Sequence, residues 1–507
     1  MAMLMFRKVL VANRGEIAVR IIRTLKLMNV RSVAVFSDVD RNSVHVSMAD
    51  EAYSIGPSSP QQSYLNKEVL VETAIKSGAD AIHPGYGFLA ENSKFADLCE
   101  KKGLAFIGPS SATLELTGNK SRCREIASSI GVPVTPGSKG EVNDIDTAKR
   151  IAEEIGYPIL VKSAFGGGGK GIREASNDKQ LEDVWNLALG EAQGSFGRAS
   201  LYIEKLIKPA RHIEMQMLAD RYGKVLYLGE RECSIQRRHQ KLIEITPSPV
   251  VGEIDRKKLG DYAIKIAKAV SYTNAGTVEF LRDESGRFYF MEINSRLQVE
   301  HPITEEVTGI DLVKEQLTVA SGERLSFEQD EIKPSGAAIE CRITAEDPLN
   351  DFAPDSGFVH RLRLPAGRGV RVDSFLDEGT RIPEYYDSLV AKIITKGRSL
   401  DEARKLMLVA LDELEISGVK TNVTFHKEVL TSDAFINWHL STDFIQEEQI
   451  LEKIKKKELE KNSKLELYGA IILSVMLSKG IHKDMEVKQG NNRKKNCVRD
   501  GRFFDLA

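Results

Sequence analysis

The sequence predicts a multi-domain protein with α/β and α+β parts. Its 507 residues are enough for about three or four folding units. The first portion alternates strand-like and helix-like segments, which indicates a parallel sheet with crossover helices. Further along, apolar runs flank a glycine-rich stretch, and two more strand-like runs flank a short turn. These observations predict a parallel N-terminal part followed by mixed α+β parts.

The N-terminal part begins with the strand-like run KVLVA, the helical pattern GEIAVRIIRTLKLM and the second strand-like run SVAVFSD. Gly15 is expected to open a helix directly after a strand. That position suits a nucleotide, but ordinary packing of the helix on the strand is the favoured interpretation.

A glycine-rich stretch, KSAFGGGGKGI, occupies residues 162–172. It matches G-x-G-x-x-G, which is weak evidence by itself, and it fails the P-loop pattern because Ile172 follows Gly171. Its apolar flanks predict a strand, a glycine loop and a second strand. Such a unit can close over phosphates as a flexible flap, with Lys162 and Lys170 as cationic partners. The alternative is a mobile surface hairpin.

Two breaks organise the remaining chain. The stretch GVPVTPG, residues 131–137, precedes a smaller inserted α+β lid that extends to about Glu204, and a strand-rich, charged core is expected beyond Lys208. A second break, residues 327–336, precedes more strands and the helical pattern DEARKLMLVALDEL. The late segment EEQILEKIKKKELEKNSKLELYG predicts a charged helix with Ile450, Leu451 and Ile454 on one face. That helix is either a solvated element or a docking helix for a partner.

The segment GTVEFLRDESGRFYFMEINSRLQVEHP, residues 276–302, predicts a hairpin with its turn at Ser285–Gly286. That turn places Glu279 directly opposite Glu292. Asn294 shares the face of Glu292, because alternate residues of a strand point the same way. Two carboxylates and an amide oxygen form a hard-oxygen site suited to Mg²⁺. The alternative is a polar, solvated strand face.

The same alternation continues through Arg296, Gln298 and Glu300. If the chain stays extended, these side chains enter the same cleft as the expected metal ligands. The order then runs from metal ligands to a cationic partner for an oxyanion and a carboxylate base. A solvated edge strand would give the same pattern.

A basic cluster lies in ERECSIQRRHQK, residues 230–241, and anionic ligands are its natural partners. The alternative is a charged surface turn, and a lone histidine such as His212 or His239 is more often structural than catalytic. No Ser–His–Asp signature or cysteine nucleophile context is visible, which argues against hydrolases. The cluster contains Arg231, Arg237, Arg238, His239 and Lys241.

The composition indicates the cellular compartment of the protein and argues against some classes of binding partner. A net charge of −2 gives no bulk electrostatic case for nucleic acid. The five cysteines are scattered without C-x-x-C or Cys/His metal spacing, which predicts a reducing compartment and no structural zinc. No signal-peptide pattern is present at the N-terminus, and the apolar run LYGAIILSVML is too short to span a bilayer. We therefore expect a cytoplasmic protein without a membrane partner.

Several long motifs together resemble the biotin carboxylases, which are ATP-grasp enzymes found as subunits of acetyl- or propionyl-CoA carboxylases and of two-subunit pyruvate carboxylase. The resemblance extends from Met5 to about Glu447. The motifs are VLVANRGEIAVRI, HPGYGFLAEN, KSAFGGGGKGI, ERECSIQRRHQK, EINSRLQVEHP, ECRITAEDP and YYDSLVAKI.

The resemblance implies a Rossmann-like N-terminal (pre-ATP-grasp) domain over residues 1–117. An ATP-grasp domain is expected over 118–330, with a mobile glycine-rich lid at about 134–206. A C-terminal α+β biotin carboxylase domain follows over 331–447. The tail 448–507 is a helical and basic segment of unassigned role, whose apolar run is either a short buried helix or a contact for another subunit.

The resemblance also implies functional residues. The catalytic residues would be Arg296, Glu300, Lys241 and Arg342. The magnesium ligands would be Glu279, Glu292 and Asn294. Residues around bicarbonate and biotin would be Lys241, Arg296, Gln298, Val299, Arg342 and Tyr86. Nucleotide contacts would come from Lys120, Lys162, Gly168, Gly169, Glu204, Lys205, Leu206, Ile207, His212, Gln236, His239, Glu279 and Glu292.

The implied activity is carboxylation of N1 of biotin through carboxyphosphate, with ATP, bicarbonate and Mg²⁺ or Mn²⁺. No Met-Lys-Met biotinylation motif occurs, so biotin is expected on a separate biotin carboxyl carrier protein, and a separate carboxyltransferase subunit is expected as well. A homodimer or a larger carboxylase complex is the expected assembly. The final acceptor stays open among acetyl-CoA, propionyl-CoA and pyruvate. The alternatives are another ATP-grasp carboxylate or amide ligase and a catalytically silent nucleotide-binding subunit.

Overall fold

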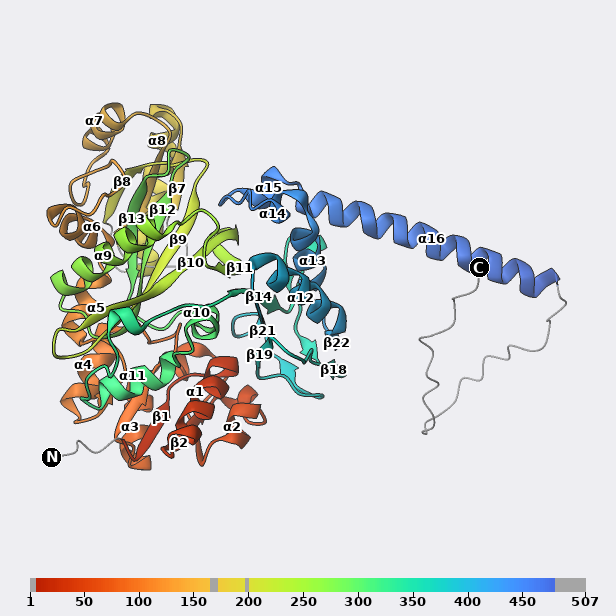
Figure 1. Ribbon diagram of the computed structural model, residues 1–507, viewed down its shortest axis with the longest axis horizontal. Helices are drawn as coiled ribbons and strands as arrows, with labels where there is room; N and C mark the ends of the chain where they lie inside the picture. Colours follow the sequence, from red (N-terminus) through yellow and green to blue (C-terminus); the bar gives the residue numbers. More distant parts are fainter. Residues whose placement is uncertain (1–5, 165–171, 197–199, 479–507) are drawn as a thin grey trace. The chain divides into compact units, whose positions relative to one another are not determined.

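The computed structural model describes residues 6–164, 172–196 and 200–478 (Figure 1). The chain forms two compact units, Met1–Ile454 and Lys455–Ala507. The glycines at 168 and 169, which were predicted to belong to a flap, lie outside the described residues.

The N-terminal part contains a five-stranded parallel sheet in the order β3-β2-β1-β4-β5, which confirms the predicted alternation. Gly15 begins α1 with φ +64°, a conformation that favours glycine. The strands are β1 Lys8–Val11, β2 Arg31–Phe36, β3 Glu51–Ser54, β4 Ala81–His83 and β5 Ala105–Phe106. The helices of this part are α1 Gly15–Leu27, α2 Val44–Met48, α3 Lys67–Ser77, α4 Ser93–Lys101 and α5 Ser111–Thr117.

A large eight-stranded sheet follows, in the order β13-β12-β9-β10-β11-β14-β21-β19. All of its pairings are antiparallel, and its β11–β14 pairing joins the five strands of residues 211–294 to the three strands of residues 337–397. Its strands are β9 Arg211–Ala219, β10 Val225–Arg237, β11 Gln240–Thr246, β12 Asn274–Arg282, β13 Phe288–Asn294, β14 Ala337–Thr344, β19 Val370–Ser374 and β21 Leu389–Gly397. The helices around this sheet are α6 Lys120–Ser129, α9 Glu253–Ala269, α10 His301–Thr308, α11 Leu312–Ala320 and α12 Leu400–Glu413.

A three-stranded sheet in the order β7-β6-β8 lies in the region predicted to be a lid, at the top of Figure 1, and we keep the name lid for this region. Strands β6 Ile159–Ser163 and β7 Ile172–Ala175 pair antiparallel, so the predicted strands on both sides of the glycines are present. Strand β8 Leu201–Lys205 completes the sheet, and α7 Ile145–Ile155 and α8 Asp178–Phe196 pack on it. The apolar side chains of this part form their own core, which includes Ile159, Trp185 and Ile203.

The last part of the first unit adds small paired strands and short helices around an apolar core that includes Phe425, Phe435 and Phe444. Its strands are β15 Glu346–Asp347, β16 Ala353–Pro354, β17 Gly357–Phe358, β18 Arg361–Arg363, β20 Arg381–Ile382 and β22 Glu415–Ser417. Its helices are α13 Val423–Thr431, α14 Asp433–Ile436 and α15 Phe444–Glu447.

Helix α16, Ile450–Ser478, begins in the first unit and continues into the second. Ile450 and Ile454 are buried in the core of the first unit and Leu451 packs against it, which confirms the predicted apolar face. Further along, large apolar side chains are exposed, so the described part of the tail is not the short buried helix considered above. These exposed residues are Leu467, Tyr468, Ile471, Ile472 and Val475. None of the helices in the described ranges combines the length and apolar character needed to cross a bilayer.

The β12–β13 hairpin places Glu279 opposite Glu292, as predicted, but the predicted turn is wrong. A longer loop, residues 283–287, closes the hairpin, and the Asp283 carboxylate accepts hydrogen bonds from Ser285 Oγ and the Arg287 backbone N–H. This loop shifts the pairing by one residue, and a bulge between Glu279 and Phe280 shifts it back. The two errors cancel at the carboxylate pair.

Candidate active site

A cavity of about 580 Å³ lies between the N-terminal part, the lid and the eight-stranded sheet. It is lined by most of the predicted site residues, from regions far apart in the sequence. These are Tyr86, Lys120, Lys162, His212, Gln236, His239, Lys241, Glu279, Glu292, Asn294, Arg296, Gln298, Val299 and Arg342. The structure does not bring Glu204, Lys205, Leu206, Ile207 or Glu300 to the cavity wall.

Lys120 and Lys162, two of the lysines that line the cavity, each contact a carboxylate. Lys120 is the first residue of α6 and forms an ion pair with Glu292. Lys162 lies on β6, where its Nζ is 2.6 Å from Glu204 Oε2. Burial raises the pKa of Glu204, but Lys162 and Arg124 outweigh burial and hold that pKa below its ordinary value. Glu204 therefore acts on the cavity through Lys162.

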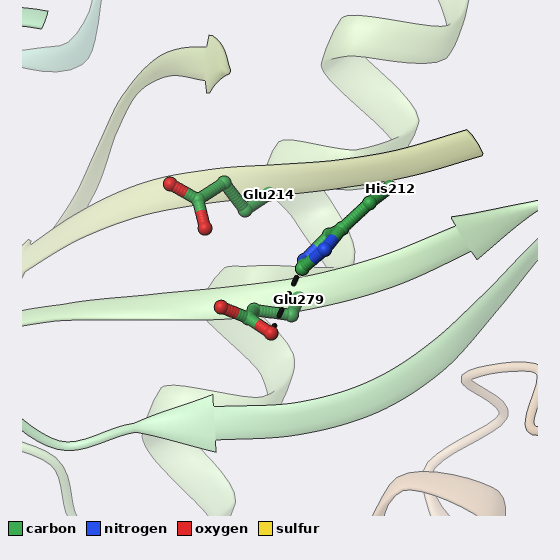
Figure 2. A group of neighbouring side chains, drawn as sticks. All are labelled: His212, Glu214 and Glu279. Atoms are coloured by element: carbon green, nitrogen blue, oxygen red, sulfur yellow. Dashed lines mark ion pairs between the residues drawn. The ribbon is translucent and has the colours of Figure 1, made fainter. Parts of the chain in front are cut away.

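The three expected metal ligands sit at one end of the β12–β13 hairpin. Glu279 and Glu292 are cross-strand neighbours, and Asn294 follows on the same strand as Glu292. His212 on β9 lies on the other side of Glu279, with its Nε2 3.1 Å from Glu279 Oε2 (Figure 2). Asn294 Oδ1 accepts a hydrogen bond of 3.3 Å from Arg296 Nη2. Carboxylate and amide oxygens of this kind fit Mg²⁺ or Mn²⁺.

Lys241 on β11 lies among three buried glutamates. Its Nζ is 2.5 Å from Glu214, 2.8 Å from Glu279 and 2.7 Å from Glu300. Burial lowers the pKa of Lys241, but these carboxylates outweigh burial and raise it well above its ordinary value. Figure 2 shows Glu214 and Glu279 close to His212, and it is the ammonium of Lys241 that neutralises this group.

Glu300 is fully buried and immediately precedes α10. Its two oxygens are bound by Lys241 at 2.7 Å and by Arg342 Nη2 at 2.9 Å. Burial raises the pKa of Glu300, but Lys241 and Arg342 outweigh burial and hold it well below its ordinary value. Glu300 is therefore ionised and is covered by two cations that themselves line the cavity.

The expectation of a continuous strand from Glu292 to Glu300 is wrong. Strand β13 ends at Asn294, and a loop leads to α10. The loop nevertheless keeps the predicted group together, because Arg296 Nη1 donates to Gln298 Oε1 at 2.8 Å and Gln298 Nε2 donates to Glu279 Oε1 at 3.3 Å. Side-chain hydrogen bonds, and not a continuous strand, therefore hold these residues together.

Most of the basic cluster binds carboxylates of the protein itself, against the expectation that anionic ligands are its partners. Arg231 is fully buried, and its Nε lies 2.5 Å from Glu214 Oε1. Arg237 and Arg238 form ion pairs with Asp351. Of the cluster's basic residues, His239 and Lys241 line the cavity.

In one part of the cavity wall, the sequence predicted only Tyr86 and Arg342 as site residues, and the other lining residues of that part were not predicted. These residues belong to motifs used for the resemblance, but no spacing rule links residues near position 15 with residues near 345 and 390. They are Arg14, Glu16, Phe88, Thr344, Glu346, Tyr386 and Ser388. We call this part of the cavity the Tyr86 half.

The carboxyl group of Glu244, which is 2.6 Å from Arg342, should make stability depend on pH. Burial raises the pKa of Glu244 to about 7 from an ordinary 4.5, and Arg342 offsets burial only in part. The folded state therefore holds this proton more tightly, so the contribution to stability is complete below about pH 4.5 and is lost as pH rises through about 7.

We expect the melting temperature of Glu244→Gln to fall less than that of wild type between about pH 5 and 7.5, because the amide has no proton to release. Calorimetry across this range measures the difference. Glu72→Gln, which removes an exposed carboxylate, should follow the wild-type curve. Parallel curves for Glu244→Gln and wild type would contradict the prediction.

Three family models match the chain in series. "Biotin carboxylase, N-terminal domain" matches residues 5–114, "Carbamoyl-phosphate synthase L chain, ATP binding domain" matches 119–328, and "Biotin carboxylase C-terminal domain" matches 340–447. Biotin carboxylase 1 of Bacillus subtilis is 49% identical over 443 residues, which cover 87% of this chain and 98% of the relative. A pyruvate carboxylase subunit of Methanothermobacter thermautotrophicus is 49% identical, with 87% of this chain and 90% of the relative covered.

Solved structures give the same result. The biotin carboxylase domain dimer of Hydrogenobacter thermophilus 2-oxoglutarate carboxylase, in complex with MgADP, ADP and bicarbonate, has a TM-score of 0.86 at 48% identity. The match covers 88% of this chain and 99% of that one. The biotin carboxylase β,γ-ATP complex from Campylobacter jejuni has a TM-score of 0.85 at 44% identity, with 87% and 99% of the two chains covered.

Proposed function

The chain belongs to the biotin carboxylase family, and from this premise we propose that it carboxylates N1 of biotin carried on a separate protein. It is an ATP-dependent ligase that forms a C–N bond and uses magnesium-bound ATP and bicarbonate. The observation that carries the proposal is the position of Glu300 behind Lys241 and Arg342, because an anion bound by these cations would lie next to a buried carboxylate base.

The phosphate side of the cavity fits ATP. Lys120 and Lys162 present ammonium groups to it, and charge-assisted hydrogen bonds to phosphate are among the strong interactions of such sites. Glu279, Glu292 and Asn294 would hold Mg²⁺ or Mn²⁺, whose chemistry is to neutralise charge on the phosphates. The other predicted nucleotide contacts remain predictions.

The bicarbonate side fits an acid–base role. Lys241, Arg296 and Arg342 would bind the bicarbonate anion, and Glu300 would take its hydroxyl proton. The bicarbonate oxygen then attacks the γ-phosphorus, the bond to ADP breaks, and carboxyphosphate forms. Carboxyphosphate separates into CO₂ and phosphate, biotin N1 loses its proton to that phosphate, and N1 bonds to CO₂. Arg296 would stabilise the ureido oxyanion during this last step.

The depressed pKa of Glu300 bears on this proposal. An ionised carboxylate can accept a proton, but a low pKa makes it a weak base. When Lys241 and Arg342 direct part of their charge to a bound anion, the two cations stabilise the Glu300 carboxylate less. Its pKa then rises toward the range of an effective base. Lys241 and Arg342 would thus have two effects: they bind the anion, and on binding it they allow the pKa of Glu300 to rise.

The proposal is tested by measuring ATP turnover and product together. We expect wild-type turnover to depend on bicarbonate, to rise when free biotin is added, and to transfer label from bicarbonate to a biotinylated carrier protein. Turnover that ignores both bicarbonate and biotin would overturn the assignment. Replacing Mg²⁺ with Mn²⁺ should preserve the reaction, and a chelator should abolish it.

Lys162→Met should raise the KM for ATP roughly 10- to 100-fold, because it removes one charge-assisted hydrogen bond to phosphate, a contact of about 1.5–3 kcal/mol. Initial rates over a range of ATP concentrations measure this change. Lys208→Met is the control, since that lysine is exposed and pairs with Glu174. An unchanged KM for Lys162→Met would remove Lys162 from the nucleotide site.

The assembly is proposed at two levels. Relatives named as subunits indicate a carboxylase of several subunits, and the dimeric neighbour supports a homodimer. We propose that a biotin carboxyl carrier protein and a carboxyltransferase are separate partners in the cytoplasm. The relatives include a subunit named for 2-oxoglutarate carboxylase, so 2-oxoglutarate joins acetyl-CoA, propionyl-CoA and pyruvate among the acceptors to be assayed.

A further inference from the structure

A buried ion pair beside the Tyr86 half of the cavity, between Glu16 and Lys392, has no role in the mechanism above. Glu16 is the second residue of α1, and Lys392 lies in β21, far away in the sequence. Lys392 Nζ is 3.2 Å from Glu16 Oε1, and their side chains are 0% and 2% exposed. Burying a pair of charges costs desolvation free energy, so the reason that this pair is present must lie in its contacts.

Those contacts reach both halves of the cavity. The Tyr86 hydroxyl donates a hydrogen bond to Glu16 Oε1, and Tyr86 lines the cavity. On the other side, Lys392 Nζ donates to the backbone oxygen of Val299 at 2.8 Å. Val299 directly precedes Glu300, the proposed base. One ion pair therefore touches the Tyr86 loop and the turn that carries Glu300.

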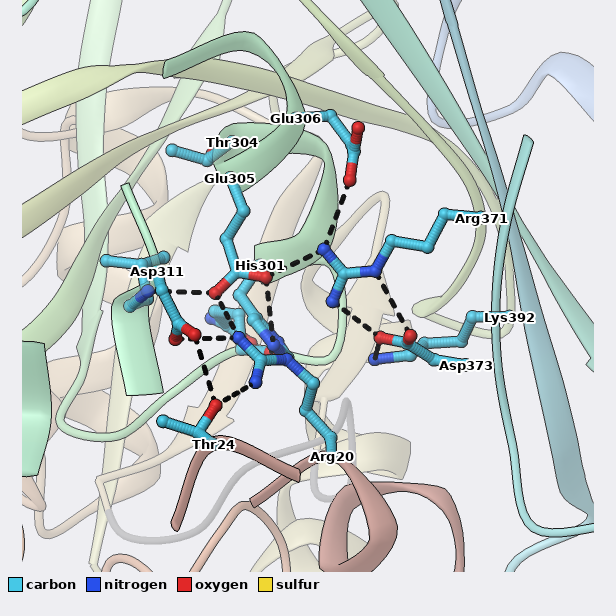
Figure 3. A network of polar contacts seen from close by, with 12 residues as sticks. Arg20, Thr24, His301, Thr304, Glu305, Glu306, Asp311, Arg371, Asp373 and Lys392 are labelled. Carbon is cyan, nitrogen blue, oxygen red and sulfur yellow. Dashed lines mark hydrogen bonds and ion pairs between the residues drawn. The ribbon is translucent and has the colours of Figure 1, made fainter. Parts of the chain in front are cut away.

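Lys392 is also held from behind by a polar network (Figure 3). Its ammonium lies 3.9 Å from Asp373, which binds Arg371 at 2.8 Å. Arg371 in turn lies 2.9 Å from Glu305, a residue of α10. These contacts define the resting position of Lys392, in which its ammonium group reaches both Glu16 and the backbone oxygen of Val299.

Glu16 retains one uncommitted acceptor. Among the described residues its Oε2 is buried without a hydrogen-bond partner, and Glu16 itself lines the cavity. Burial raises the pKa of Glu16 to about 7, with Lys392 offsetting part of that effect. Buried acceptors without partners are uncommon and costly, and a donor entering the Tyr86 half can supply the missing hydrogen bond.

We propose that Glu16 and Lys392 are positioning residues that couple occupancy of the Tyr86 half by biotin to the placement of Glu300. A ring that contacts Tyr86 or donates to Glu16 alters the pull of Glu16 on Lys392. Lys392 transmits the change to the carbonyl of Val299 and so to Glu300. This inference rests on the proposed function, and it identifies the residues through which biotin would stimulate ATP turnover.

The test uses the full chain and measures bicarbonate-dependent ATP turnover with and without free biotin. The readout is the ratio of the two rates at saturating ATP. Glu16→Gln preserves shape and removes the charge, and we expect it to lower the ratio at least about 5-fold, the lower end of typical coupling between sites. Lys392→Met should lower the ratio similarly, and the double variant should lower it no further than either single one.

Glu230→Gln is the matched control, because Glu230 is also a buried carboxylate in an ion pair, 2.7 Å from Arg256. Its ratio should match wild type, and an equal fall in this control would show general loosening and overturn the proposal. An unchanged ratio in Glu16→Gln, or effects that multiply in the double variant, would overturn it too. If wild-type turnover itself ignores biotin, the proposed function fails first and this inference falls with it. Glu16→Gln decides the matter if Lys392→Met does not fold.

Discussion

Glu300→Gln should reduce transfer of label from bicarbonate to biotin by about 10²- to 10⁴-fold, the usual contribution of a general base. The amide keeps the shape of the side chain but cannot accept the bicarbonate proton. The fold should survive, because Lys241 keeps its contacts with Glu214 and Glu279 and Arg342 keeps Glu244.

Measuring labelled-bicarbonate transfer and thermal unfolding on the same variant separates the loss of the base from a loss of stability. Glu315→Gln is a suitable control, since it removes another buried carboxylate, on α11, away from the cavity wall. Transfer within a few fold of wild type in Glu300→Gln would reassign the base. A large fall in melting temperature would show instead that Glu300 mainly balances the charges around it.

Arg231→Leu should lower the free energy of unfolding by about 3–5 kcal/mol, because it leaves Glu214 buried without one of its two cations. The guanidinium also donates to Gln216 at 2.7 Å and to Thr304 at 2.9 Å. Leucine satisfies none of these acceptors.

Denaturant unfolding monitored by tryptophan fluorescence and circular dichroism measures this loss. Arg31→Leu provides the contrast, since Arg31 is exposed, pairs with Glu51 at 2.8 Å and should cost less than about 1 kcal/mol. Adding Glu214→Gln to Arg231→Leu should recover part of the stability by removing the unpaired charge. Equal losses for Arg231→Leu and Arg31→Leu would contradict the prediction.

Local pattern predicted the parts of the site that local geometry controls. Strand alternation placed Asn294 on the strand face of Glu292, and the flanking apolar runs placed strands on both sides of the glycines. The pairing of Glu279 with Glu292 is present, but it was predicted from a turn that is wrong. The turn of the hairpin could not be predicted, because the capping of its loop by Asp283 and the compensating bulge depend on packing.

The other features of the site could not be predicted, because they depend on burial and on contacts between residues far apart in the sequence. The sequence shows Arg231 and Lys241 as equivalent members of one basic cluster, yet one is locked to Glu214 inside the sheet and the other also reaches the cavity. Glu16 and Lys392 carry no sequence signal for each other, because α1 and β21 lie far apart in the sequence and must both be folded before these residues meet. The resemblance supplied roles for residues that such spacing could not connect.

The carboxylate partners of the cavity lysines bear on the rate of product release in the proposed reaction. Lys120 is bound by Glu292, Lys162 by Glu204, and Lys241 by three glutamates. In the proposed reaction, a phosphate group that binds these lysines would have to compete with carboxylates of the chain itself for the same ammonium ions. We expect this competition to weaken the binding of ADP and phosphate after the reaction, so that these glutamates would speed product release.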